Sequence, residues 1–123
     1  FILVTHCLGD GAAALASVQN RHRFSQEHTD YLSARFYQPV PRLNEARLIR
    51  EIASAALDIS DGLVADLQHI CTASDLGAVI DVENIPLSPA LQSLNNLQLA
   101  YEWALSGGDD YELLFTVPPE KEA

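Results

Sequence analysis

Residues 57–66, LDISDGLVAD, form the stretch around which the chain is organised. A short apolar run ends before Asp58, and from Leu63 onward apolar residues recur at positions 63, 67, 70 and 71. That spacing places them on one face of a helix. Three oxygen-bearing side chains, those of Asp58, Ser60 and Asp61, therefore lie on a tight turn at the N-terminus of a predicted helix.

An acidic turn at a helix start combines two physical properties. The free N–H groups and the macrodipole of the helix favour negative charge, and clustered carboxylates attract hard cations. A magnesium-bound polyphosphate satisfies both. The alternative is purely structural: Ser60 is the N-cap, Asp61 a first-turn acid favoured by the dipole, and Gly62 a turn residue. The stretch alone leaves both interpretations open.

A second polar turn, SGGDDYEL at residues 106–113, lies near the other end of the chain. Its two glycines end a predicted helix, and Asp109 and Asp110 then stand at the start of a predicted strand. Adjacent carboxylates repel each other unless water, a metal ion or a cationic substrate group compensates them. The structural alternative is a Schellman-type helix end followed by a solvated strand edge.

The composition predicts one globular domain. The chain has 123 residues, of which 48% are hydrophobic and 20% charged, and this is enough for a core of its own. A formal net charge of -10 opposes binding to nucleic acids, whose phosphates require a basic surface, and to anionic membranes.

Location is predicted from the absence of sorting signals in the sequence. No apolar run is long enough to span a membrane and no signal-peptide pattern opens the chain, so we expect a cytoplasmic protein. Cys7 and Cys71 lie far apart without metal-ligand spacing, and we expect buried free thiols in a reducing compartment.

The chain has no Lys or Arg between Glu51 and Glu120. Every arginine lies before residue 51, and the only lysine is Lys121. If the remainder handles phosphate, we expect it to use backbone N–H groups and a bound metal. The chain has no Gly-Lys-Ser/Thr sequence, which excludes a Walker-type P-loop. An EF-hand is excluded as well, because counting from Asp58 puts Gly62 at loop position 5 and His69 where a bidentate Glu belongs.

The remaining elements follow from periodicity and from helix and strand breakers. Strands are predicted at 1–5, briefly before Asp58, at 77–82 and at 111–117; helices are predicted at 12–18, at 30–36 with Thr29 as cap, at 43–53, at 63–73, from Ser88 onward and at 97–105. This order predicts an α+β fold in α/β/α layers, with a mixed sheet of about four strands covered by helices. Because the chain starts in a strand-like run without Met, we expect it to be part of a longer protein.

The two polar turns carry a resemblance to a known family. Residues 58–70, DISDGLVADLQHI, and residues 103–117, WALSGGDDYELLFTV, resemble the thiamine-monophosphate kinases, which belong with the aminoimidazole-ribonucleotide synthetase-like proteins. The opening residues 4–13 and the segment 39–42 resemble the same family in the same order. The first turn departs from the family, since residues 6–8 and Gly11 replace the usual Gly-Thr-Pro and Ser.

The resemblance implies a magnesium-dependent kinase that transfers the γ-phosphoryl group of ATP to thiamine monophosphate, giving thiamine diphosphate. It implies that residues 1–123 are the C-terminal domain of a two-domain enzyme, which as a whole is a homodimer. The N-terminal domain, absent from this chain, carries most of the magnesium-binding acids and much of the nucleotide site. We therefore expect the fragment to fold but to be inactive alone.

Position by position, the resemblance implies that Asp58 and Asp61 are magnesium ligands, that Ser60 contacts ATP and that Asp109 contacts the substrate. The family commonly has Glu where this chain has Asp109, so the side chain reaches less far. No further residue is assigned a catalytic role. Donor and acceptor are both phosphates, so metal ions and positioning carry the reaction.

Two alternatives remain open. One is another ATP-using member of the same superfamily, of the selenophosphate or aminoimidazole-ribonucleotide synthetase type. The other is a noncatalytic, acidic ligand-binding module that has lost its partner domain.

Overall fold

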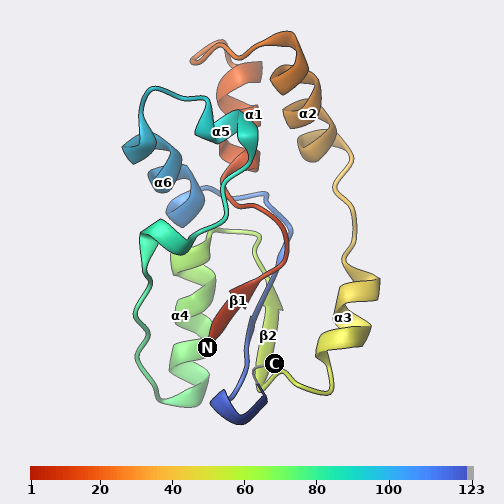
Figure 1. Ribbon diagram of the computed structural model, residues 1–123, viewed down its shortest axis with the longest axis vertical. Coiled ribbons are helices and arrows are strands. Elements are labelled where there is room, and N and C mark those ends of the chain that lie inside the picture. The colour runs from red at the N-terminus through yellow and green to blue at the C-terminus, as the bar shows by residue number, and fades with distance from the viewer. Residues whose placement is uncertain (122–123) are drawn as a thin grey trace.

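The computed structural model describes residues 1–121 and has the predicted α+β fold. Figure 1 shows two halves: a sheet half, in which α4 and α3 lie on opposite sides of the strands, and a helical half with α1, α2, α5 and α6. In chain order the elements are β1 (Ile2–Val4), α1 (Asp10–Val18), α2 (Gln26–Tyr37), α3 (Leu43–Ile49), β2 (Ala55–Asp58), α4 (Leu63–Ser74), a 3-10 turn (Val82–Asn84), α5 (Pro89–Gln92), α6 (Leu97–Ser106), β3 (Leu113–Thr116) and a second 3-10 turn (Pro119–Lys121).

The last strand in sequence, β3, is the central strand of the sheet. The strand order is β1-β3-β2, and β3 pairs antiparallel with both neighbours, so that Leu114 lies opposite Val4 on one side and Leu57 on the other. Over the described residues the sheet therefore has three antiparallel strands, and the predicted mixed sheet of about four strands is wrong in number and direction. Long helical segments connect the strands, so no hairpin turn revealed their order in the sequence.

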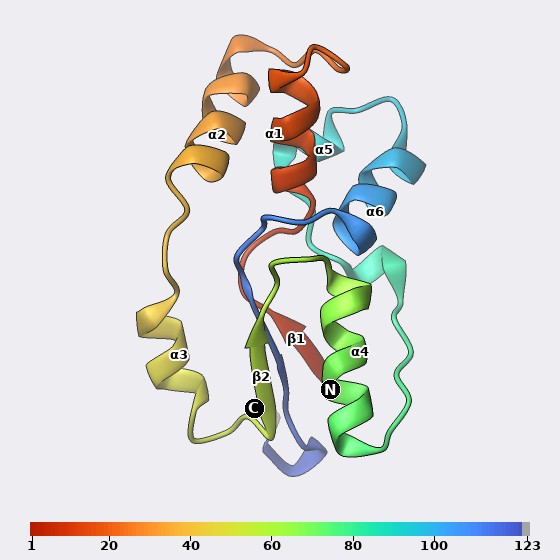
Figure 2. The same ribbon diagram turned by 180° about the vertical axis from the view of Figure 1, so that it is seen from behind.

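The strand predicted at 77–82 is the one that is missing from residues 1–121. This segment runs extended alongside α4 (Figure 2), and Val79 is 91% exposed. Asp81 instead caps the following 3-10 turn, because its side chain accepts a hydrogen bond from the Glu83 N–H at 3.2 Å. A strand is stable only when it pairs with a neighbouring strand, and this segment has no such partner among residues 1–121. Gly77 also has no side chain that could pack against the rest of the fold.

The predicted helices are present, with shifted ends. α1 begins at Asp10, two residues before the predicted start at 12, and α2 begins at Gln26. The cap of α2 is Ser25 rather than Thr29, since Ser25 Oγ accepts a hydrogen bond from the His28 N–H at 3.2 Å. α3 ends at Ile49 instead of residue 53. α3 has no buried residue, so the face predicted for it does not pack into the core.

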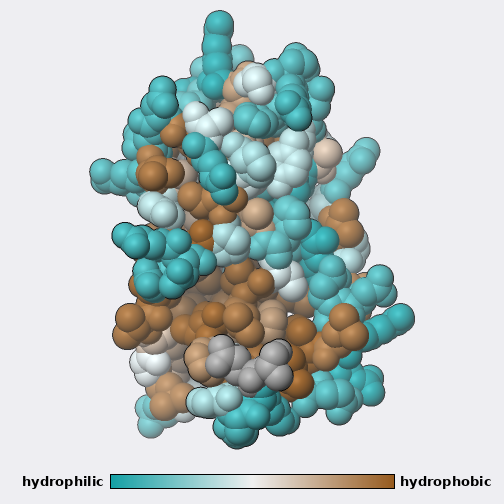
Figure 3. All heavy atoms as spheres, in the orientation of Figure 1, coloured by the Kyte–Doolittle hydropathy of each residue, from teal (hydrophilic) through white to brown (hydrophobic). Residues whose placement is uncertain are grey.

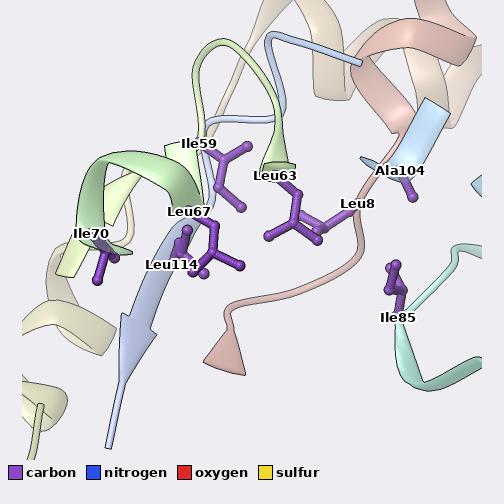
Figure 4. Packing of buried hydrophobic residues seen from close by; sticks show 8 residues of the cluster. All are labelled: Leu8, Ile59, Leu63, Leu67, Ile70, Ile85, Ala104 and Leu114. Atoms are coloured by element: carbon purple, nitrogen blue, oxygen red, sulfur yellow. The ribbon is translucent and has the colours of Figure 1, made fainter. Parts of the chain in front are cut away.

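The core of the sheet half lies between α4 and the sheet (Figure 4). Leu63, Leu67 and Ile70 form the predicted apolar face of α4, and they belong to one buried cluster with Leu114 of β3 and with Ile59. The helical face predicted from the spacing is confirmed. It holds the acidic turn directly above this core, because Ile59 and Leu63 flank the turn on both sides.

The helical half has a separate core in which small side chains dominate. Alanines let the backbones of its four helices approach one another closely, and a few leucines fill the remaining space. This cluster consists of Ala13, Ala14, Leu32, Ala90, Leu91, Leu94 and Ala100.

An apolar groove of about 740 Å³ opens beside the core of the sheet half. It lies between β1, α4 and the segment 76–86, and Figure 3 shows hydrophobic side chains gathered on this part of the surface. Leu76 and Val79 are 70% and 91% exposed. None of the described helices has the length and the apolar character that crossing a bilayer requires.

Candidate functional site

The two polar turns, separate in sequence, are neighbours in the fold. The N–H of Asp109 donates to the carbonyl oxygen of Ser60 at 2.9 Å, and the N–H of Tyr111 donates to the carbonyl of Ile59 at 2.8 Å. In the opposite direction, the N–H of Ile59 donates to the carbonyl of Glu112 at 2.8 Å. These bonds continue the pairing of β2 with β3 beyond the strand ends. The register of the sheet therefore fixes how the turns face each other.

Glycines permit this close approach. A Cβ atom on Gly108 would lie 2.9 Å from the carbonyl oxygen of Ser60, and a Cβ atom on Gly62 would lie 3.0 Å from the carbonyl oxygen of Ser106. Both neighbours are backbone atoms, which cannot rotate away as a side chain would. Each turn thus needs its glycine because of the other turn.

The predicted site residues face solvent on these adjoining turns. The side chains of Asp58, Ser60, Asp61 and Asp109 are all exposed. Asp109 adopts a φ of 65°, and its Oδ1 accepts a hydrogen bond from the Tyr111 hydroxyl at 3.0 Å. That hydrogen bond and the charge of Asp109 raise the pKa of the Tyr111 hydroxyl, and the charge of Asp58 adds to the effect. Both acids therefore act on the Tyr111 hydroxyl, which lies on the second turn.

The chemistry of the donor set fits magnesium only if other groups complete the coordination shell. Within residues 1–121, no three or more His, Cys, Asp or Glu side chains are placed to hold a metal ion on their own. Magnesium in phosphate-transfer sites commonly takes one or two protein carboxylates and completes its octahedron with water and phosphate oxygens. Asp58 and Asp61 meet that smaller requirement, because both are exposed oxygen donors on one turn.

Asp66, on the first turn of α4, closes the acidic turn from the inside. This residue is buried, and its Oδ2 accepts hydrogen bonds from the N–H groups of Ser60 at 3.0 Å, Asp61 at 3.1 Å and Gly62 at 3.1 Å. The N-cap of α4 is Gly62, with no capping side chain, so the interpretation of Ser60 as N-cap is wrong. Backbone N–H groups were predicted to bind phosphate. These three N–H groups are not available for it, because they donate to the Asp66 carboxylate.

The two adjacent acids of the second turn, Asp109 and Asp110, lie in different environments. Asp109 faces solvent, whereas Asp110 is buried at the start of α1, where its two carboxylate oxygens accept hydrogen bonds from the N–H groups of Gly9 and Gly11, both at 2.9 Å. Burial raises the pKa of Asp110 to about 6, against the lowering effect of the two hydrogen bonds. Neither Gly107, the C-cap of α6, nor Gly108 after it has a positive φ, so the helix does not end in a left-handed Schellman turn. The solvated edge predicted there applies to Asp109 alone.

Two residues after Asp110, Glu112 binds two arginines in the interior. Arg42 donates from Nε to Oε1 at 2.7 Å and from Nη2 to Oε2 at 3.0 Å, and Arg35 donates from Nη1 to Oε2 at 2.7 Å. The Thr5 hydroxyl adds a bond to Oε1 at 2.7 Å. Burial opposes ionisation of Glu112, but the hydrogen bonds from Arg42, Thr5 and Arg35 outweigh it and lower its pKa.

Arg35 extends this ion network to α1. Its Nε donates to Asp10 Oδ2 at 3.2 Å, and Asp10 also accepts hydrogen bonds from the Tyr31 hydroxyl at 2.7 Å and from Ser88 Oγ at 2.6 Å. Burial and the hydrogen bond to Asp10 raise the pKa of Tyr31. Arg35 and Arg42 are therefore held by carboxylates of the domain, and they join the helical half to the sheet.

Sequence reasoning missed the buried acids of this region. Asp66 left a signal, since an acid in the first turn of a helix can reach back to the preceding backbone. Glu112 left none, because its partners Arg42 and Arg35 lie 70 and 77 positions away in sequence. Asp110 likewise bonds across 99 and 101 positions.

Comparison with known proteins matches the whole chain, residues 1–123, to "AIR synthase related protein, C-terminal domain". Among curated proteins, the chain is 51% identical over 120 residues to the thiamine-monophosphate kinase of Salmonella typhimurium and 48% identical over 119 residues to that of Escherichia coli. Each alignment covers 96% of this chain and 37% of the relative. The chain thus spans little more than a third of the length of these relatives.

Solved structures agree with the sequence relatives. The crystal structure of the thiamine-monophosphate kinase from Stenotrophomonas maltophilia superposes with a TM-score of 0.90 at 38% identity, over 98% of this chain and 40% of that chain. The structure of AaThiL complexed with AMPPCP and TMP superposes with a TM-score of 0.85 at 34% identity, over 99% of this chain and 40% of that chain. The similarity therefore extends from the sequence to the whole described fold.

Proposed function

Because this chain belongs to the AIR synthase related protein family and spans its C-terminal domain, we propose that it is part of a kinase that phosphorylates thiamine monophosphate to thiamine diphosphate with ATP. The observation that carries the proposal is the junction of the two polar turns. It places Asp58, Ser60 and Asp61 next to Asp109 on one exposed surface. The names of the relatives and the AMPPCP and TMP complex of AaThiL support the choice of donor and acceptor.

We propose roles for these four residues from the charges of the two reactants. Both reactants carry negative phosphates, and the turns offer them carboxylate and hydroxyl oxygens with no Lys or Arg. Asp58 and Asp61 therefore hold magnesium, which when bound neutralises phosphate oxygens and keeps donor and acceptor in line. Ser60, between them, donates its hydroxyl to the nucleotide. Asp109, on the facing turn, contacts thiamine monophosphate, whose thiazolium ring carries the positive charge that a carboxylate attracts.

The domain needs a partner for this reaction. Two carboxylates cannot fix a nucleotide and an acceptor phosphate alone, and the chain spans 37% of the first relatives. We assign the remaining magnesium ligands and most of the nucleotide contacts to an N-terminal domain of the same protein, in a cytoplasmic homodimer. No nucleic acid or membrane surface is required.

The test is a product assay on the full-length protein. With ATP, magnesium and thiamine monophosphate we expect thiamine diphosphate and ADP in equal amounts, separated by chromatography. Residues 1–123 alone are expected to melt cooperatively by circular dichroism and to form no product. Turnover with selenide or with a ribonucleotide acceptor, but not with thiamine monophosphate, would move the protein to a synthetase of the same family. Nucleotide binding without any turnover would make it a binding module.

A further inference from the structure

A single buried carboxylate oxygen binds the whole acidic turn from behind. Oδ2 of Asp66 accepts the N–H groups of Ser60, Asp61 and Gly62 at 3.0, 3.1 and 3.1 Å, and Asp66 is only 5% exposed. Because the three N–H groups are consecutive and each peptide unit is planar, one atom fixes the orientation of three successive peptide planes.

This arrangement differs from an ordinary helix cap. A capping side chain normally accepts from the second or third residue inside the helix and so stabilises the helix itself. Asp66 instead binds the N–H of the N-cap Gly62 and those of Ser60 and Asp61, which lie before the helix. The stabilised element is therefore the turn.

The chemistry of the contact suits a rigid support. Consecutive backbone N–H groups on a turn form a concave site for an anion, and here the chain supplies the anion itself. Hydrogen bonds to an ionised carboxylate are about twice as strong as those between neutral groups. The second turn restrains the same backbone from the other side, since the Asp109 N–H binds the Ser60 carbonyl at 2.9 Å. The backbone between Asp58 and Gly62 is thus held on both sides.

We propose that Asp66 is a positioning residue for the metal-binding acids: by filling the backbone N–H site of the turn, it sets the directions in which Asp58 and Asp61 present their carboxylates to a divalent cation. The inference rests on the proposed function in taking Asp58 and Asp61 as ligands. Residues that orient metal ligands without touching the metal commonly contribute about 10- to 100-fold to metal affinity or activity.

The experiment compares Asp66→Ala and Asp66→Asn with the wild type in the full-length protein. Asp66→Ala frees the three N–H groups, whereas Asp66→Asn keeps a carbonyl oxygen of the same shape without the charge. Leu32→Ala serves as the destabilised control, because Leu32 is fully buried in the separate core of the helical half. Two quantities are measured below the melting temperatures of all variants: the magnesium concentration that gives half-maximal velocity, and the affinity for Mn²⁺ followed by electron paramagnetic resonance without substrate.

For Asp66→Ala we expect both quantities to weaken by about tenfold or more. Asp66→Asn should fall between Asp66→Ala and the wild type, and Leu32→Ala should melt earlier with unchanged metal dependence. Wild-type metal dependence in Asp66→Ala would overturn the inference and leave the proposed function standing. If Asp66→Ala does not fold, unchanged Mn²⁺ affinity in Asp66→Asn overturns it equally. A wild type without kinase activity would refute the proposed function, and the Mn²⁺ measurement would still decide the role of Asp66.

Discussion

The turns at the starts of α4 and α1 are both closed by a buried carboxylate, which comes from a nearby residue at α4 and from a distant residue at α1. Each begins at a glycine-bearing turn whose N–H groups bind a buried carboxylate. At α4 the acid is Asp66, four to six positions away on the same helix. At α1 the acid is Asp110, which comes from the far end of the chain. In both places the anion at the helix start belongs to the protein.

The difference lies in what each closed turn presents to solvent. The α4 turn is self-contained, so its outward side is free to carry Asp58 and Asp61 toward a ligand. The α1 start is completed only when β3 is in place, and its neighbours are the buried ion pairs of Glu112. We therefore expect changes at the α4 turn to reduce activity first and changes around α1 to reduce stability first.

The largest effect is expected at the exposed acids of the α4 turn. Asp58→Asn or Asp61→Asn in the full-length protein should lower kcat by about two to three orders of magnitude, because each removes a proposed magnesium ligand, which would act in the transition state. The melting temperature should stay the same or rise, since both side chains are exposed and carry like charge. Asp75→Asn is the matched control, an exposed acid at the other end of α4. Near-normal turnover of both variants at saturating magnesium would contradict the assignment.

Next in size is the ion network beside α1. Glu112→Gln removes the charge that two largely buried guanidinium groups share, and we expect a loss of about 3 kcal/mol or more in the free energy of unfolding. Glu51→Gln makes the same change in the exposed pair with Arg50 and should lose less than about 1 kcal/mol. Chemical denaturation of residues 1–123 measures both. Equal losses in the two variants would show that burial of the network does not matter.

The sequence predicted the parts of this comparison that depend on local spacing. The helix at 63–73, its buried face and the turn before it were correct, because periodicity and a glycine encode them within a few residues. The sheet was not predictable in the same way: β3 became its centre only through pairings with β1 and β2 far away in the chain. For the same reason the adjacent acids Asp109 and Asp110 looked equivalent, although one is exposed and one is buried.

A third prediction uses the buried acid at the α1 start. The pKa of Asp110 is about 6 in the fold against an ordinary value of 3.8, so between these values the folded chain binds a proton that the unfolded chain releases. The stability that this proton contributes is fully present below about pH 4 and is lost as the pH rises through 6.

Asp110→Asn lacks this titration, so its deficit in stability relative to the wild type should be larger at pH 4 than at pH 7, by roughly 2 to 3 kcal/mol. Thermal melts of both proteins across that range measure the difference, in which the other titrating groups cancel. A deficit that is constant from pH 4 to 7 would mean that Asp110 is ionised throughout.

The smallest effects are expected on the KM values, at the exposed side chains of Ser60 and Asp109, one on each turn. Ser60 lies on the turn that Asp66 holds, and Asp109 lies beside Asp110, which anchors the start of α1, so these two proposed substrate contacts have different supports. In the full-length protein, Ser60→Ala should raise the KM for ATP about tenfold, equivalent to about 1.4 kcal/mol, and leave the KM for thiamine monophosphate nearly unchanged. Asp109→Ala should do the opposite, and Asp109→Glu, which restores the longer side chain, should keep or lower the KM for thiamine monophosphate.

Each substrate serves as the control for the other in steady-state kinetics. The reverse pattern would exchange the roles of the two turns, and equal effects on both substrates would mean that each variant disturbs the junction between them, because Ser60 and Asp109 are joined through a backbone hydrogen bond of 2.9 Å.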